Sequence, residues 1–219
     1  MNAELLGRAS ALLENQMNFR LKGVPQAKVG ARLAAIRLLD SQAKGALKAL
    51  DVADKALRGI KGEETLKSEL KMLRARAHSK TGEANKALRL LQGLPSTEKL
   101  AKLRADIAWN GGLWGDAAKA FKNLLAYESI SLSRPMNEYQ ENLVLNYSIA
   151  LNLSGDRTAL SKLRSRYDAL MNQSENARIF DLVTRPRQLG LIEDRESIMS
   201  LISEVNLFGE FLESYRKSG

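Results

Sequence analysis

The feature that most constrains this chain is a helix–glycine–helix pattern that recurs along it. In the clearest copy, Ala75 and Ala87 lie twelve residues apart with Gly82 between them, and Leu91 follows four residues later. Small side chains are needed where two helices cross closely, and the later large side chain fills the groove beside them. Repetition of this size predicts stacked helical hairpins, an architecture that usually binds other proteins rather than performing chemistry.

Three further copies follow the pattern to different degrees. The weaker copy consists of Ala34, Ala46 and Leu50, and the copy that keeps every feature consists of Ala105, Gly112, Ala117 and Phe121. The degenerate copy consists of Ser148, Gly155 and Leu160, because Ser and Leu replace the two alanines. The spacing between copies is irregular, so the sequence predicts a drifted repeat rather than a regular array.

The composition agrees with helices throughout. Aromatic residues make up 5% of the 219 residues and only four prolines occur. Alanine and leucine are abundant and favour helices, whereas strands prefer β-branched and aromatic residues. Apolar periodicity predicts helices over residues 2–20, 26–42, 43–58, 64–80, 83–93, 97–110, 115–127, 137–153, 157–171, 174–184 and 193–216.

We therefore predict an all-α fold, a right-handed α-solenoid of antiparallel hairpins with a C-terminal capping helix. The expected organisation is one elongated domain over residues 1–219. It has an N-terminal helix in 1–25, which Gly23-Val24-Pro25 ends, hairpins in 26–171 and capping helices in 172–219. The predicted last helix carries an apolar stripe broad enough to cover the last hairpin as a cap.

The repeated Ala–Gly–Ala–large pattern resembles the tetratricopeptide repeat, in which small residues in both helices and a later large residue carry the packing. The resemblance covers roughly residues 27–167. The Trp and Tyr usual in the first helix are missing from most copies, and so is the closing Pro. In general character the chain also resembles the C-terminal helical region of large bacterial tetratricopeptide-like proteins.

In that family the first helices of successive repeats line a concave groove that binds a partner segment. Carrying the groove positions over predicts partner-binding residues Glu69, Met72, Arg76, Ser79, Lys99, Lys102, Asp106 and Trp109. Family members that hold a peptide carboxylate use Lys and Asn in the groove. Lys102 matches the Lys, but Asp106 stands where Asn is expected. The resemblance therefore favours a mixed groove for an extended or helical peptide over a carboxylate clamp.

The net positive charge of the chain is confined to its first half. Residues 1–97 contain 18 Lys and Arg against 9 Asp and Glu, whereas residues 98–219 contain 16 of each. A basic patch is predicted at Lys67, Lys71, Arg74 and Lys80, to which Arg76 adds. Such a patch attracts nucleic acid or another anionic surface, and the alternative is an ordinary solvated helical surface.

Catalysis is not expected from this sequence. There is no cysteine, and His78 is the only histidine, which excludes Cys-based sites, His clusters and Ser-His-Asp triads. His78 is expected to be packed or hydrogen-bonded. Gly111–Gly115 lacks the Lys-Ser/Thr of a phosphate-binding loop and is predicted to be a hairpin turn with Trp114 packed nearby. We expect a non-enzymatic protein without metal or cofactor.

The sequence thus predicts a protein–protein interaction scaffold or adaptor, with nucleic-acid binding by the N-terminal half as the alternative. No run of eighteen apolar residues occurs and the N-terminus does not resemble a signal peptide. A complete chain is then expected in the cytoplasm. A piece of a larger bacterial protein leaves a periplasmic or membrane-tethered location open. The partner and the oligomeric state are not indicated.

Overall fold

The computed structural model describes residues 3–131 and 133–185, and this part of the chain contains helices and no strand. The all-α prediction is confirmed for these residues, and the predicted helix at 193–216 lies outside them. The elements are α1 (Ala3–Asn15), η1 (Gln16–Arg20, a π-helical turn), α2 (Gly23–Leu39), α3 (Ala43–Ala56), α4 (Glu64–Lys80), α5 (Ala84–Leu90), α6 (Glu98–Asn110), α7 (Trp114–Tyr127), α8 (Glu138–Ser154), α9 (Arg157–Met171) and α10 (Ala177–Thr184).

The chain divides into two compact units within α6. Of the described residues, those up to Leu103 belong to the first unit and those from Arg104 onward belong to the second. Each unit has its own buried apolar side chains, among them Leu33 and Leu73 in the first and Phe121 in the second. The prediction of a single elongated domain stays a prediction.

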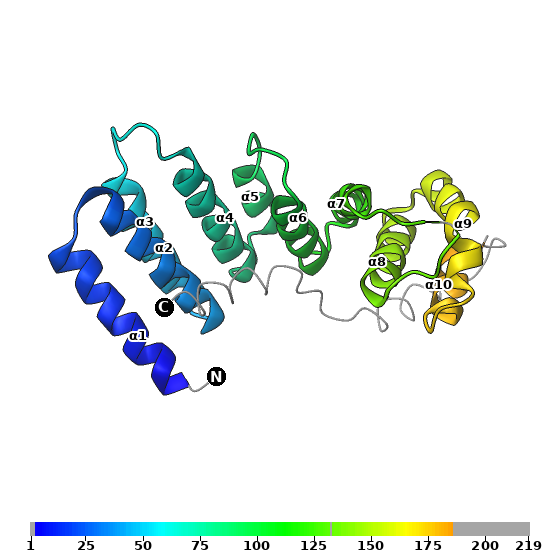
Figure 1. Cartoon of the computed structure of the whole chain (residues 1–219), viewed down its shortest axis with the longest axis horizontal. Coiled ribbons are helices and arrows are strands. Elements are labelled where there is room, and N and C mark those ends of the chain that lie inside the picture. The colour runs from blue at the N-terminus through cyan, green and yellow to red at the C-terminus, as the bar shows by residue number, and fades with distance from the viewer. Residues whose placement is uncertain (1–2, 132, 186–219) are drawn as a thin grey trace. The chain divides into compact units, whose positions relative to one another are not determined.

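In the first unit, two hairpins follow each other along the chain. α2 packs against α3, α4 packs against α5, and α4 also contacts both helices of the preceding hairpin. Figure 1 shows α2 and α3 side by side, with α1 along α2. The repeated small residues explain how closely these helices approach, because all four have no exposed surface: Ala34, Ala46, Ala75 and Ala87.

Gly30 marks the closest approach of α2 to α3. A Cβ atom built on Gly30 would lie 2.9 Å from the Cβ of Ala53 and 3.2 Å from the carbonyl oxygen of Ala49. Any larger residue would push the two helices apart, because protein interiors have almost no free space to take up the extra atom.

The start of α2 differs from the prediction. The first break lies at Leu21–Lys22, where the backbone is extended, and Gly23 already begins α2. Pro25 lies in the first turn of that helix, where the missing N–H removes no helical hydrogen bond. The boundary between the predicted N-terminal helix and the first hairpin therefore moves from residue 25 to residue 22.

The turn between α4 and α5 has the geometry expected from Gly82. Gly82 has a φ of +83°, which is costly for any residue with a Cβ. The N–H of Glu83 donates to the carbonyl of His78 at 2.9 Å, so that the end of α4 keeps a backbone partner. The predicted hairpin over residues 64–93 is thus present as α4 and α5.

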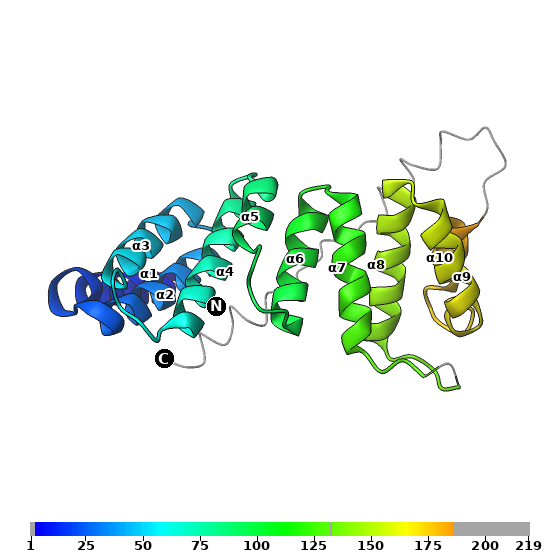
Figure 2. The same ribbon diagram turned by 90° about the horizontal axis from the view of Figure 1, so that it is seen from above.

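In the second unit, α7 packs against α8, α8 packs against α9, and α10 contacts both α8 and α9 (Figure 2). A capping box starts α8: the Asn137 side chain accepts from the N–H of Gln140, and the Gln140 side chain accepts from the N–H of Asn137. Gly155, with a φ of +78°, ends α8. Near that end, the Asn152 side chain donates to the carbonyl of Val183 at 2.6 Å and links α8 to α10.

Candidate partner-binding site

Four of the predicted groove residues lie on one face of α4, as their spacing of three and four residues requires. Arg76 is 3% exposed and Met72 is 9% exposed, whereas Glu69 and Ser79 are half-buried. The apolar side chain of Met72 and the guanidinium of Arg76 are therefore buried beneath this face. Glu69 and Ser79 are the members of this set that a partner can reach.

Glu69 on α4 and Lys99 on α6 are brought together within the first unit. Burial raises the pKa of the Glu69 carboxyl, and the nearby positive charge of Lys99 offsets part of that rise. Burial likewise lowers the pKa of Lys99, and Glu69 opposes the change. The structure thus places two of the predicted residues in one half-buried, oppositely charged pair.

Lys102 lies one turn further along α6. Its ammonium nitrogen is 2.9 Å from a carboxylate oxygen of Glu98, an i,i+4 pair on the same helix. Lys102 therefore has a local anionic partner, and its side chain is 22% exposed.

Asp106 and Trp109 belong to the second unit and are buried, with 0% and 3% exposed surface. The indole of Trp109 meets the rings of Trp114 and Phe121 edge to face, at centroid distances of 5.6 and 5.5 Å. Asp106 accepts a hydrogen bond of 2.7 Å from the Asn110 side chain. Trp109 holds α6 to α7 and is a core residue, although its helical position predicted a partner contact.

The predicted basic patch is partly neutralised. The guanidinium of Arg74 lies 2.9 Å from Asp51 and 2.7 Å from Asp54, so that it ties α4 to α3. Lys67 pairs with Glu64 at 2.9 Å. The other two members, Lys71 and Lys80, are exposed on α4.

His78 is buried and hydrogen-bonded, as expected from the sequence. Its Nδ1 lies 2.7 Å from a carboxylate oxygen of Glu83, and the Thr81 hydroxyl donates to the same oxygen at 3.2 Å. The hydrogen bond with His78, followed by that of Lys86, lowers the pKa of Glu83. These contacts fasten the turn between α4 and α5. The described residues contain no cluster of three or more side chains that could hold a metal ion.

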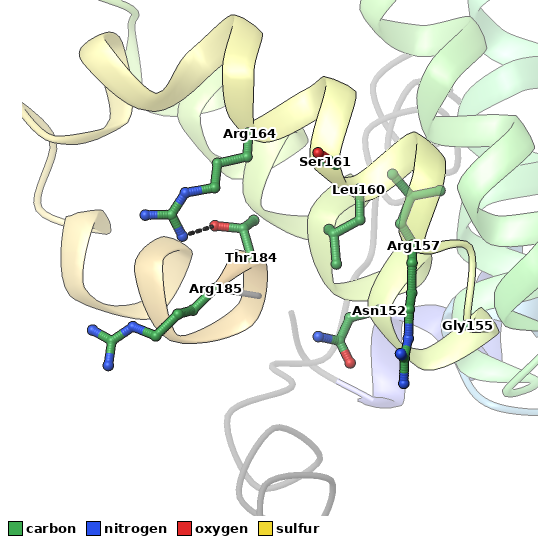
Figure 3. Close-up of a pocket in the computed structure, with 9 residues that line it drawn as sticks. Asn152, Gly155, Arg157, Leu160, Ser161, Arg164, Thr184 and Arg185 are labelled. Atoms are coloured by element: carbon green, nitrogen blue, oxygen red, sulfur yellow. Dashed lines mark hydrogen bonds between the residues drawn. The ribbon is translucent and has the colours of Figure 1, made fainter. Parts of the chain in front are cut away.

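The second unit contains a pocket of about 350 Å³ that was not predicted from the sequence (Figure 3). Its lining comes from three helices: Leu151, Asn152, Gly155, Arg157, Leu160, Ser161, Arg164, Thr184 and Arg185. The seven-residue spacing of Arg157 and Arg164 places both side chains on one face of α9, and this spacing could have been recognised in the sequence. The contribution of α10 could not be read from local sequence, because it depends on how that helix packs.

Two of the three arginines of the pocket pair with Asp181, and the third does not. Arg164 donates to Asp181 at 2.8 Å and to the Thr184 hydroxyl at 3.0 Å. Arg185 also donates to Asp181, and the two arginines, Arg164 first, lower the pKa of this carboxyl. Arg157 is exposed and forms no ion pair with any residue that the structure describes. Its charge is thus available to a bound group.

Comparison of the chain with protein families, curated proteins and solved structures finds no match. Among the described residues, no helix is long and apolar enough to cross a membrane.

Proposed function

We propose that this protein is a non-enzymatic interaction scaffold built from tetratricopeptide-like hairpins, which form a right-handed α-solenoid. The observation that carries the proposal is the packing of the first unit. Two successive hairpins bury their repeat alanines, Ala34, Ala46, Ala75 and Ala87, completely, and α4 contacts both helices of the hairpin before it. The second hairpin of this unit thus packs on the first, as neighbouring repeats do in a helical repeat protein.

The binding surface that we propose is the half-buried face of α4 together with the start of α6. Its reachable members are Glu69, Ser79, Lys99 and Lys102. A carboxylate, a hydroxyl and two ammonium groups beside the apolar Met72 suit a peptide segment of mixed polarity. Interfaces of this kind combine a small apolar centre with a polar rim. Asp106 and Trp109 contribute by supporting α6 rather than by touching the partner.

Site-specific photo-crosslinking tests this surface. A photo-reactive amino acid at Ser79 should capture a protein partner in cells, whereas the same group at the exposed Lys71, on another face of α4, should not. A peptide copied from the captured partner should then bind the purified chain. Ser79→Trp should abolish that binding and Lys71→Trp should leave it unchanged. Equal capture at both positions would show that the α4 face is not the binding surface.

The second candidate function is binding of nucleic acid by the first unit. It is favoured by exposed cations that form no ion pair with described residues, such as Lys28 and Arg32 on α2 and Lys48 on α3. Phosphate binding of this kind depends steeply on salt, because each contact releases counterions.

The salt dependence of binding to a labelled single strand separates the two functions. A steep loss of affinity with salt, made shallower by Lys28→Glu and Lys48→Glu, supports the second function. An affinity too weak to measure at 50 mM salt, a condition at which such contacts are strong, contradicts it.

A further inference from the structure

The pocket between α8, α9 and α10 combines an apolar floor with a positive charge, that of Arg157, which forms no ion pair with any described residue. Leu151 and Leu160 are 3% and 8% exposed and form the floor. The lining that the structure describes contains three guanidinium groups and no carboxylate. A ligand that fits this lining combines aliphatic groups with at least one carboxylate.

Figure 3 shows how the polar groups surround the floor. Arg157 and Asn152 lie on one side, and Arg164 and Thr184 lie on the other. The Asn152 side chain donates to the carbonyl of Val183 at 2.6 Å, which links α8 to α10. Arg164 is held by Asp181 and Thr184. The walls are therefore fixed by contacts within the unit, and Arg157 is the cation left for a ligand.

The chain itself carries a segment of the required chemistry, and it leaves the described part of the structure at the rim of this pocket. Arg185 both lines the pocket and is the last described residue. Residues 189–194 read Leu-Gly-Leu-Ile-Glu-Asp, with three large aliphatic side chains, then two carboxylates and no cation. Ile192 is seven residues beyond Arg185, which an extended chain spans in about 25 Å.

We infer that the pocket between α8, α9 and α10 is the docking site of this chain's own residues 189–194. The aliphatic side chains cover Leu151 and Leu160, and Glu193 or Asp194 pairs with Arg157. A tether of a few residues gives the segment an effective concentration in the millimolar range, so that even weak contacts suffice to hold it in place. The inference is independent of the proposed function, which concerns the first unit.

Disulfide trapping in the full chain tests the inference, because the sequence contains no cysteine to compete. The test variant carries Ser161→Cys in the pocket and Ile192→Cys in the segment. The control carries Lys162→Cys instead; Lys162 is exposed on α9 and does not line this pocket. Under mild oxidation the test pair should form the intramolecular disulfide at least about tenfold faster than the control pair, since docking raises their effective concentration.

A charge exchange tests the role of Arg157 in the same assay. Arg157→Glu should slow trapping of the Ser161/Ile192 pair, and adding Glu193→Arg and Asp194→Arg should restore the rate. Equal rates for the two cysteine pairs would overturn the inference. Disulfides that form only between molecules, at a rate that rises with protein concentration, would also overturn it and would assign the pocket to a second copy.

Discussion

At the scale of single residues, two helical glycines are expected to respond oppositely to the same substitution. Replacing Gly by Ala inside a helix usually stabilises it by about 0.5–1 kcal/mol, and we expect this gain at Gly7, where an added Cβ meets nothing within 4 Å. At Gly30 the same Cβ would press on Ala53. Gly30→Ala should therefore lower the free energy of unfolding by about 1–3 kcal/mol.

Urea unfolding followed by circular dichroism measures both changes. Gly7→Ala serves as the control for helix propensity. If Gly30→Ala were as stable as the parent chain, the close approach of α2 to α3 would be wrong.

The half-buried Glu69 predicts a specific pH dependence of stability. Its pKa is raised above the ordinary value of 4.5, so the native state holds this proton to higher pH than the unfolded state does. The stability therefore falls as the pH rises through the range just above 4.5. Glu69→Gln should flatten this part of the profile. Lys99→Gln removes the charge that offsets the rise and should steepen it.

Unfolding free energies measured between pH 4 and pH 7 test this prediction, because the range just above 4.5 lies within that window. A slope that neither substitution changes would mean that Glu69 is not desolvated in the folded chain.

The repeat pattern predicted burial correctly where two helices of a hairpin approach each other closely. All the alanines of the two clear repeat copies, such as Ala87 and Ala117, have no exposed surface. Trp109 shows the limit of this reasoning. Its helical position predicted a partner contact, but the packing of α7 places Trp114 and Phe121 against it. Which neighbour covers a residue depends on distant parts of the chain.

At the scale of elements, the boundaries depend on caps that periodicity alone does not reveal. The reciprocal capping box of Asn137 and Gln140 at the start of α8 was not predicted from the apolar spacing. The π-helical turn Gln16–Arg20 after α1 has no signature in apolar spacing either. The pocket between α8, α9 and α10 was not predicted for a similar reason, because Arg157 lies on α9 and Arg185 directly follows α10.

The capping box makes a testable contribution to the second unit. Asn137→Ala removes the acceptor for the Gln140 N–H and should lower the free energy of unfolding by about 1 kcal/mol. Asn142→Ala, at an exposed position inside α8, should leave it unchanged or raise it slightly. Equal effects of the two substitutions in chemical denaturation would mean that the cap does not stabilise α8.

At the scale of the whole molecule, the two units share α6. The helix runs from Glu98 to Asn110, and the boundary between the two units falls between Leu103 and Arg104. Leu103 in its first part and Trp109 in its second part are both buried. Because one continuous helix supplies core residues to both units, unfolding of either unit removes a support of the other.

We therefore expect the two units to unfold in one cooperative transition. Both tryptophans, Trp109 and Trp114, lie in the second unit, so their fluorescence reports on that unit alone. Far-ultraviolet circular dichroism reports on the helices of both. Coincident urea curves from the two probes are the expected result, which is the standard test for a two-state transition.

The Gly30→Ala variant tests whether a change in the first unit reaches the second unit, because the substitution lies in the first unit only. If α6 couples the units, the fluorescence midpoint should move to lower urea together with the dichroism midpoint. An unmoved fluorescence curve would show two independent units that share a helix without sharing stability. In a repeat protein, stability is the sum of the repeats and their interfaces. A shift at both probes would therefore also favour the solenoid proposal over two separate domains.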